Sequence, residues 1–172
     1  MYLVDTDVLG MLRRSRSAGT LPPWLAQQLH QGLVISAATV LEIEQGASWV
    51  GQRHPHKEVE IRAWLFQVRT AHNTTILPIG PEEAILWGRM RVTPGLRGFV
   101  EGTGTGRARP PRSEADLVIA ATAITTGRQI VTRNLSHMTL IDRFFRLPGI
   151  IDPWGHRLDP AAAPLMQMIL DL

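Results

Sequence analysis

Short apolar runs with β-strand character alternate with helical stretches along most of this chain of 172 residues. Strands are expected at residues 2–4, 33–36, 76–79, 129–132 and 150–151. Helices are expected from near residue 8, with Thr6 or Asp7 as N-cap, then over 37–46, 58–71, 81–90 and 114–126, the last with Gly127 as C-cap. Short strands that are apolar throughout are typical of parallel sheets with both faces covered. The alternation predicts an α/β fold with a central, mostly parallel sheet flanked by helices, and ligands in such folds bind at the carboxyl ends of the strands.

The composition excludes several classes of protein. The chain is 44% hydrophobic and 19% charged, which suits one folded domain and not a disordered segment. It has no cysteine, so a disulfide framework, a thiolate zinc site and a cysteine nucleophile are excluded. No apolar run approaches the ~18 residues that a membrane span requires. The first residues also lack the basic segment of a signal peptide, so we expect a cytoplasmic protein.

Positive charge is concentrated in one region, although the net charge of the whole chain is only +3. Six arginines and a single acid, Glu101, lie between Arg89 and Arg112, while Lys57 is the only lysine of the chain. Most of this region is a segment rich in glycine and arginine, Thr93–Arg112, which we expect to be a long functional loop. Arginine binds phosphate and carboxylate in a bidentate manner, so an anionic partner is expected.

Three acidic residues are expected at the same edge of the predicted sheet. Asp5 directly follows the first strand, Glu42 lies early in the helix after the second strand, and Asp116 lies in the first turn of the helix before a later strand. Three carboxylates close together repel one another unless a cation is bound. Oxygen ligands without cysteine favour Mg²⁺ or Mn²⁺ over zinc.

Each of these acids also has a purely structural interpretation. Thr39 and Glu42 have the spacing of a capping box, as do Ser113 and Asp116, and Asp5 may be read as a helix cap. Capping and metal binding do not exclude each other, so both interpretations stay open for all three acids.

Five segments together resemble a known family. Tyr2–Val8, Ser36–Ile43 and Asp116–Ala123 resemble the three acidic motifs of PIN-domain ribonucleases, and the similarity is greatest to VapC/FitB-type toxins of type II toxin–antitoxin systems. Ile130–Asn134 and Ile151–Trp154 resemble the last strands of that family. The five segments occur in the family's order over nearly the whole chain.

The resemblance implies a PIN-like fold and a specific activity. It implies a nuclease domain at residues 1–155. The C-terminal extension at 156–172 lies beyond the resemblance and is expected either to pack on the domain or to add to a dimer interface. The implied activity is that of an RNA endonuclease dependent on Mg²⁺ (or Mn²⁺), in which water activated by the metal hydrolyses the phosphodiester. The implied partners are the RNA substrate, a cognate antitoxin protein and a second copy of the chain.

The resemblance also assigns the site. It implies that Asp5 and Asp116 bind the metal, with Glu42 completing the set of ligands. Asn134 stands where the family has a fourth acid, and is expected to position a water molecule on the metal. His137 replaces an aspartate that the family often has three residues later.

Further roles and two alternative functions are left open. Thr132, Thr6 or Asp7 is expected to orient the Asp5 carboxylate. One alternative is a PIN-like module that binds RNA or a protein partner and has lost catalytic power through Asn134. The other is a phosphatase resembling haloacid dehalogenases, because Asp5 and Asp7 have the spacing of that family's paired aspartates. The arginines of the 93–112 segment are either RNA contacts or a solvated loop.

Overall fold

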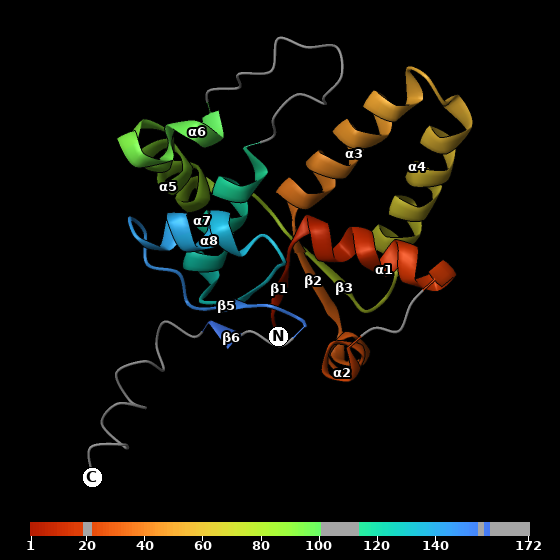
Figure 1. Cartoon of the computed structure of the whole chain (residues 1–172), viewed down its shortest axis with the longest axis horizontal. Coiled ribbons are helices and arrows are strands. Elements are labelled where there is room, and N and C mark those ends of the chain that lie inside the picture. Colours follow the sequence, from red (N-terminus) through yellow and green to blue (C-terminus); the bar gives the residue numbers. More distant parts are fainter. Residues whose placement is uncertain (19–21, 101–113, 155–156, 159–172) are drawn as a thin grey trace.

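A computed structural model describes residues 1–18, 22–100, 114–154 and 157–158 of the chain (Figure 1). Its six strands form one sheet in the order β3-β2-β1-β4-β5-β6. The strands are β1 (Leu3–Val4), β2 (Leu33–Ser36), β3 (Thr74–Leu77), β4 (Ile130–Val131), β5 (Ile150–Ile151) and β6 (Arg157–Leu158). The first five are parallel to their neighbours, and β6 pairs with β5 in the antiparallel direction. The predicted mostly parallel sheet is therefore confirmed.

Helices cover both faces of this sheet (Figure 1). They are α1 (Thr6–Ala18), α2 (Pro23–Gln31), α3 (Ala37–Gly51), α4 (Pro55–Thr70), α5 (Pro81–Val92), the 3-10 turn η1 (Pro94–Leu96), α6 (Arg97–Val100), α7 (Ala115–Thr126) and α8 (Leu135–Asp142). Residues of α1 to α4 share one hydrophobic cluster with the sheet, and α5 to α8 share the other, to which Ala38 at the start of α3 also belongs. The layers thus follow the chain order, with the first half of the helices on one face and the second half on the other.

Neighbouring residues of a strand point to opposite faces of the sheet, and in β1, β4 and β5 every residue is buried, whereas β3 is only partly buried. In β1, Leu3 packs into the cluster with α7 while Val4 packs into the cluster with α1 and α2. The same alternation separates Ile130 from Val131 in β4. This explains why the strand sequences are continuously apolar instead of alternating with polar residues.

Helix α7 is the most deeply buried helix of the fold. Its residues from Leu117 to Ala123 are all buried, which accounts for the lack of a polar face in its sequence. The helix ends at Gly127, whose φ of 63° is left-handed and whose N–H caps the last turn. That C-cap was expected from the sequence and is confirmed.

Two local expectations are wrong. The segment predicted as a loop from Thr93 begins with η1 and α6, so at least its first part is helical; residues 101–113 lie outside the described residues. Helix α1 begins at Thr6, so neither Thr6 nor Asp7 is its N-cap as expected. Asp5 takes that place, because its main-chain carbonyl accepts a hydrogen bond from the amide of Leu9.

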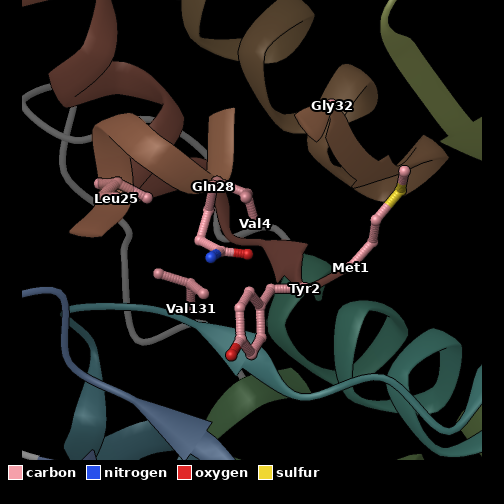
Figure 2. A pocket seen from close by; sticks show the side chains of 7 residues that line it. All are labelled: Met1, Tyr2, Val4, Leu25, Gln28, Gly32 and Val131. Carbon is pink, nitrogen blue, oxygen red and sulfur yellow. The ribbon is translucent and has the colours of Figure 1, made fainter. Parts of the chain in front are cut away.

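The amino-terminal edge of the sheet contains a small pocket, shown in Figure 2. Its lining is mainly apolar and consists of Met1, Tyr2, Val4, Leu25, Gln28, Gly32 and Val131. It contains no acidic or basic side chain, so it offers no chemistry. Among the described residues, no helix has both the length and the apolar character needed to cross a membrane. The strand β6 is the part of the expected C-terminal extension that the structure describes; residues 159–172 lie outside it.

Candidate active site

Asp5 is a buried carboxylate at the carboxyl end of the central strand β1. The residue is only 2% exposed. Its Oδ2 accepts a hydrogen bond of 2.7 Å from the Thr132 hydroxyl, and its Oδ1 accepts one of 2.6 Å from the amide of Thr6. Burial, and then the charges of Asp116 and Asp7, raise the pKa of Asp5 to about 8, although the two hydrogen bonds oppose the shift. The fold therefore fixes this carboxylate in place while making its negative charge costly.

Asp7 and Glu42 add two further carboxylates from α1 and α3. Asp7 Oδ2 accepts a hydrogen bond of 3.0 Å from the amide of Arg133, whereas its buried Oδ1 has no hydrogen-bond partner among the described residues. Burial raises the pKa of both Asp7 and Glu42, and the charge of Asp116 adds to both shifts. The nearby Thr6 hydroxyl offsets part of this increase in the pKa of Glu42.

Asp116 lies in the first turn of α7 and is held by two side chains that follow β4. Its Oδ2 is 2.6 Å from Nδ1 of His137 and 3.3 Å from Nδ2 of Asn134. The Asn134 amide is in turn 2.7 Å from the same ring nitrogen. The His137 ring packs edge-to-face on Phe99 of α6 with centroids 4.9 Å apart. Asn134, the residue in place of a fourth acid, thus contacts Asp116 directly.

The expected carboxylates act on one another through their charges. The charge of Asp116 acts on Asp5, Asp7 and Glu42, which come from different elements of the chain. In the part of the chain that the structure describes, however, no three histidine or acidic side chains are close enough to hold one metal ion together. The structure therefore shows an anionic site, without a closed set of metal ligands.

The chemistry of these donors fits a hard divalent cation. All are carboxylate oxygens, which Mg²⁺ and Mn²⁺ prefer. A buried aspartate with a raised pKa and a buried Asp7 oxygen without a hydrogen bond are two polar groups that a cation would stabilise. Asp5, Glu42 and Asp116, with Asp7 beside them, thus have the ligand chemistry that such an ion prefers, although their spacing in this structure does not close around one ion.

Sequence reasoning anticipated part of this arrangement. The expected contact between Thr132 and Asp5 is present. The capping box proposed for Thr39 and Glu42 is wrong, because Ser36 is the N-cap of α3 and accepts the hydrogen bond from Ala38. The capping box expected for Ser113 and Asp116 stays a prediction, because Ser113 lies outside the described residues.

Two features of the site were missed. The contact between His137 and Asp116 was not expected, and neither was the unsatisfied oxygen of Asp7. The spacing of Asn134 and His137, three residues apart, is one turn of a helix and was the available signal. This spacing predicts a contact only if residues 135–142 form a helix, and no helix was expected there.

Comparison with known proteins supports the fold assignment. The PIN domain family model matches residues 2–137. A chain of FitAcB from Neisseria gonorrhoeae is 19% identical with a TM-score of 0.57, covering 91% of this chain and 100% of that one. A chain of VapBC-1 from nontypeable Haemophilus influenzae is 19% identical with a TM-score of 0.56, covering 90% and 98%.

A third similar structure is a chain of DNA-bound VapBC from Salmonella typhimurium, which is 20% identical with a TM-score of 0.55 and covers 88% and 97%. No curated protein sequence matches the chain. The family model covers the strands β1 to β4 and every acidic residue of the site. The chain therefore belongs to the PIN domain family.

Proposed function

We propose that this protein is an RNA endonuclease dependent on Mg²⁺ or Mn²⁺ that acts in the cytoplasm as the toxin of a type II toxin–antitoxin system. The observation that carries the proposal is the site itself, in which the charge of Asp116 acts on Asp5, Asp7 and Glu42 around a buried position. PIN-family membership supports nuclease chemistry. A bound cation would relieve the repulsion within such a cluster of like charges at neutral pH.

Asp5 and Asp116 would hold the cation, and Glu42 would complete its oxygen ligands. When bound, the cation supplies charge neutralisation at the scissile phosphate and a lowered pKa for an attacking water. Thr132 fixes the orientation of Asp5 through its 2.7 Å hydrogen bond. Asn134 fixes Asp116 in the same way and has an amide with which to orient a water.

A protein partner is proposed on two grounds. The similar structures are VapBC and FitAcB complexes, which supports an antitoxin protein as inhibitor. A homodimer is proposed from the family resemblance of the sequence. Large apolar side chains also remain exposed on the α3–α4 hairpin, namely Leu41, Val59 and Phe66 at 51%, 67% and 65% exposure. Exposed apolar patches of this kind are typical of protein interfaces.

The test is cleavage of total cellular RNA by the purified chain with Mg²⁺ or Mn²⁺, with the ends of the products mapped. We expect EDTA to abolish cleavage and Asp5→Asn to reduce it by about 10³-fold, because neutral Asn supplies no charge to the cation. Glu60→Gln is the matched control, since it removes an exposed acid of α4 away from the site. Sedimentation of the same samples measures the proposed dimer.

Three outcomes distinguish the alternatives. Cleavage that survives EDTA or Asp5→Asn contradicts the proposed metal site. RNA binding without cleavage at any Mg²⁺ or Mn²⁺ concentration instead supports the catalytically weakened module. Turnover of a small phosphomonoester with a trapped aspartyl-phosphate on Asp5 supports the phosphatase.

A further inference from the structure

An exposed tryptophan and an arginine form a pair beside the acidic site. Trp154 follows β5 and Arg133 follows β4, and these two strands are parallel neighbours. Both residues therefore lie at the carboxyl edge of the sheet, where Asp5 follows β1. The guanidinium carbon of Arg133 is 5.1 Å from the centroid of the Trp154 ring, and Trp154 is 45% exposed. The pair thus presents an aromatic ring and a positive charge next to the carboxylates.

The main chain on the Trp154 side is fixed. The indole N–H of Trp24 donates a 2.8 Å hydrogen bond to the carbonyl of Pro153, the residue directly before Trp154. The amide of Trp154 donates a 2.9 Å hydrogen bond to Oδ1 of Asp152. These contacts place the ring without burying it, which makes it preorganised for a ligand.

The Arg133 side is tied to the acidic site itself. The amide of Arg133 donates to Oδ2 of Asp7, and its guanidinium lies 3.4 Å from the sulfur of Met11 on α1. The hydrogen bond to Asp7 uses the main chain, while the charge of the Arg133 guanidinium also acts on the Asp7 carboxylate and lowers its pKa. The side chain itself is exposed, so its charge is accessible to a ligand as well as to Asp7. A phosphate approaching four carboxylates meets repulsion, and a cation fixed at the edge of the cluster offsets it.

We propose that Trp154 and Arg133 form a nucleotide-binding platform, in which a base of single-stranded RNA stacks on the indole and the guanidinium binds an adjacent phosphate. This proposal rests on the proposed ribonuclease function and extends it to substrate positioning. Stacking on an aromatic side chain is open to every base but requires that the base be unpaired. The platform therefore selects single-stranded RNA, or a loop, over a duplex.

The experiment measures RNA binding in the Asp116→Asn background, which keeps the platform and prevents cleavage. Fluorescence anisotropy is recorded with a labelled single-stranded RNA of mixed sequence, and with the same strand in a duplex, in Mg²⁺ at several salt concentrations. The variants are Trp154→Ala, Trp154→Phe and Arg133→Ala. The controls are Phe144→Ala and Arg143→Ala, an exposed aromatic and an exposed arginine after α8, which packs on the other face of the sheet.

The expected results separate the two side chains. Trp154→Ala raises the Kd for single-stranded RNA about 10-fold, Trp154→Phe recovers most of the affinity, and neither changes the salt slope. Arg133→Ala lowers the slope of log K against log salt by about 0.7, the value for one phosphate contact on a single strand. The two controls bind like the parent, and the duplex is insensitive to Trp154→Ala. Thermal unfolding of each variant shows that a loss of binding is not a loss of fold.

The possible failures are distinguishable. If Trp154→Ala and Trp154→Phe bind single-stranded RNA like the controls while the unsubstituted chain cleaves RNA, the platform is wrong and the nuclease stands. If the Trp154 variants lose binding but the unsubstituted chain never cleaves, the platform stands without the nuclease. If the chain with Asp116→Asn and the unsubstituted chain bind no RNA, both proposals are overturned.

Discussion

The two edges of the same sheet are built in opposite ways. At the amino edge the chain turns through glycine: Gly32 precedes β2 with a φ of 130°, and Gly127 ends α7 with a φ of 63°. The nearby pocket in Figure 2 is lined mainly by apolar side chains. At the carboxyl edge, side chains make the connections, as in the hydrogen bonds of Thr132 with Asp5 and of Asn134 with Asp116. The amino edge is thus organised for stability, while the carboxyl edge accepts repulsion between carboxylates.

The comparison of the two edges shows that function and stability conflict at the carboxyl edge of the sheet. The buried Asp5 carboxylate is held by two hydrogen bonds yet has a raised pKa, so its ionisation opposes folding. Of the residues that the structure describes, Asp5 is the only buried acid, and it lies at the carboxyl edge. A substitution at the carboxyl edge should therefore impair activity and spare or improve stability, and one at the amino edge should do the reverse.

The largest expected effect is on catalysis at the carboxyl edge. Asp116→Asn removes the charge that acts on the three other carboxylates, so we expect RNA cleavage to fall by about 10³-fold. The thermal midpoint of the metal-free protein should not fall, because a repulsive charge has been removed. Cleavage rates and thermal unfolding on the same preparation check this, with Glu60→Gln beside it. A variant that is both inactive and markedly less stable would show that Asp116 is a structural residue.

The next effect concerns pH and is specific to Asp5. Its folded-state pKa is about 8, above the unfolded value near 3.8, so folding favours the protonated form. The contribution of this group to stability is therefore lost progressively as the pH rises from about 4 to 8. Asp5→Asn cannot ionise, and we expect it to be about 1–3 kcal/mol more stable than the parent in EDTA at pH 8, with no difference near pH 4. Urea unfolding across this pH range measures it; a parent that gains stability relative to the variant as the pH rises would contradict the assignment.

At the amino edge, Gly32→Ala should destabilise the protein without changing the chemistry. A side chain at a φ of 130° is strained, and the added carbon would lie 3.2 Å from the Asn73 carbonyl oxygen. We expect a loss of about 1–3 kcal/mol in the free energy of unfolding. Gly88→Ala is the matched control, because that helical glycine has open space and the change favours a helix. Equal losses of stability in Gly32→Ala and Gly88→Ala would contradict the proposed role of the amino edge. So would a Gly32→Ala variant that folds but no longer cleaves RNA.

The smallest effect concerns His137, which contacts Asp116 with a neutral or positive ring where the family often has an aspartate. We expect His137→Asp to tighten Mg²⁺ binding about 5-fold, because a carboxylate adds a charged oxygen donor to the site. Gln67→Asp adds the same charge on the exposed surface of α4 and should leave the affinity unchanged. Calorimetric titration with Mg²⁺ compares them; weaker binding by His137→Asp would indicate that the imidazole itself supports the ion.

How far the sequence predicts this molecule depends on whether the signal is local. The strand Leu33–Ser36 is apolar up to its last residue and is preceded by Gly32, so its limits were predicted correctly. Residues Pro94–Val100 were wrongly placed in a loop, because one proline and two glycines mask a turn of helix whose Leu96 and Phe99 are held by burial against the core.

The candidate site shows the same limit. Asp5 and its contact with Thr132 were predictable, since both follow neighbouring parallel strands. The contact of His137 with Asp116 was not, because it depends on how α8 packs against α7 and on the position of Phe99. Nor does sequence spacing reveal that the carboxylates stop short of a closed set of metal ligands, which is a matter of ångströms.

The central claim is that these carboxylates form one cation site. Its most direct test is calorimetric titration of the metal-free protein with Mn²⁺ at pH 7, carried out in two buffers of different ionisation enthalpy. Asp5 is mostly protonated at pH 7, so binding of Mn²⁺ should release about one proton per ion. Both the uptake of Mn²⁺ and the release of the proton should disappear in Asp5→Asn, and both should persist in Glu60→Gln. Mn²⁺ uptake by Asp5→Asn equal to that of the parent, or no uptake by the parent, would contradict the account.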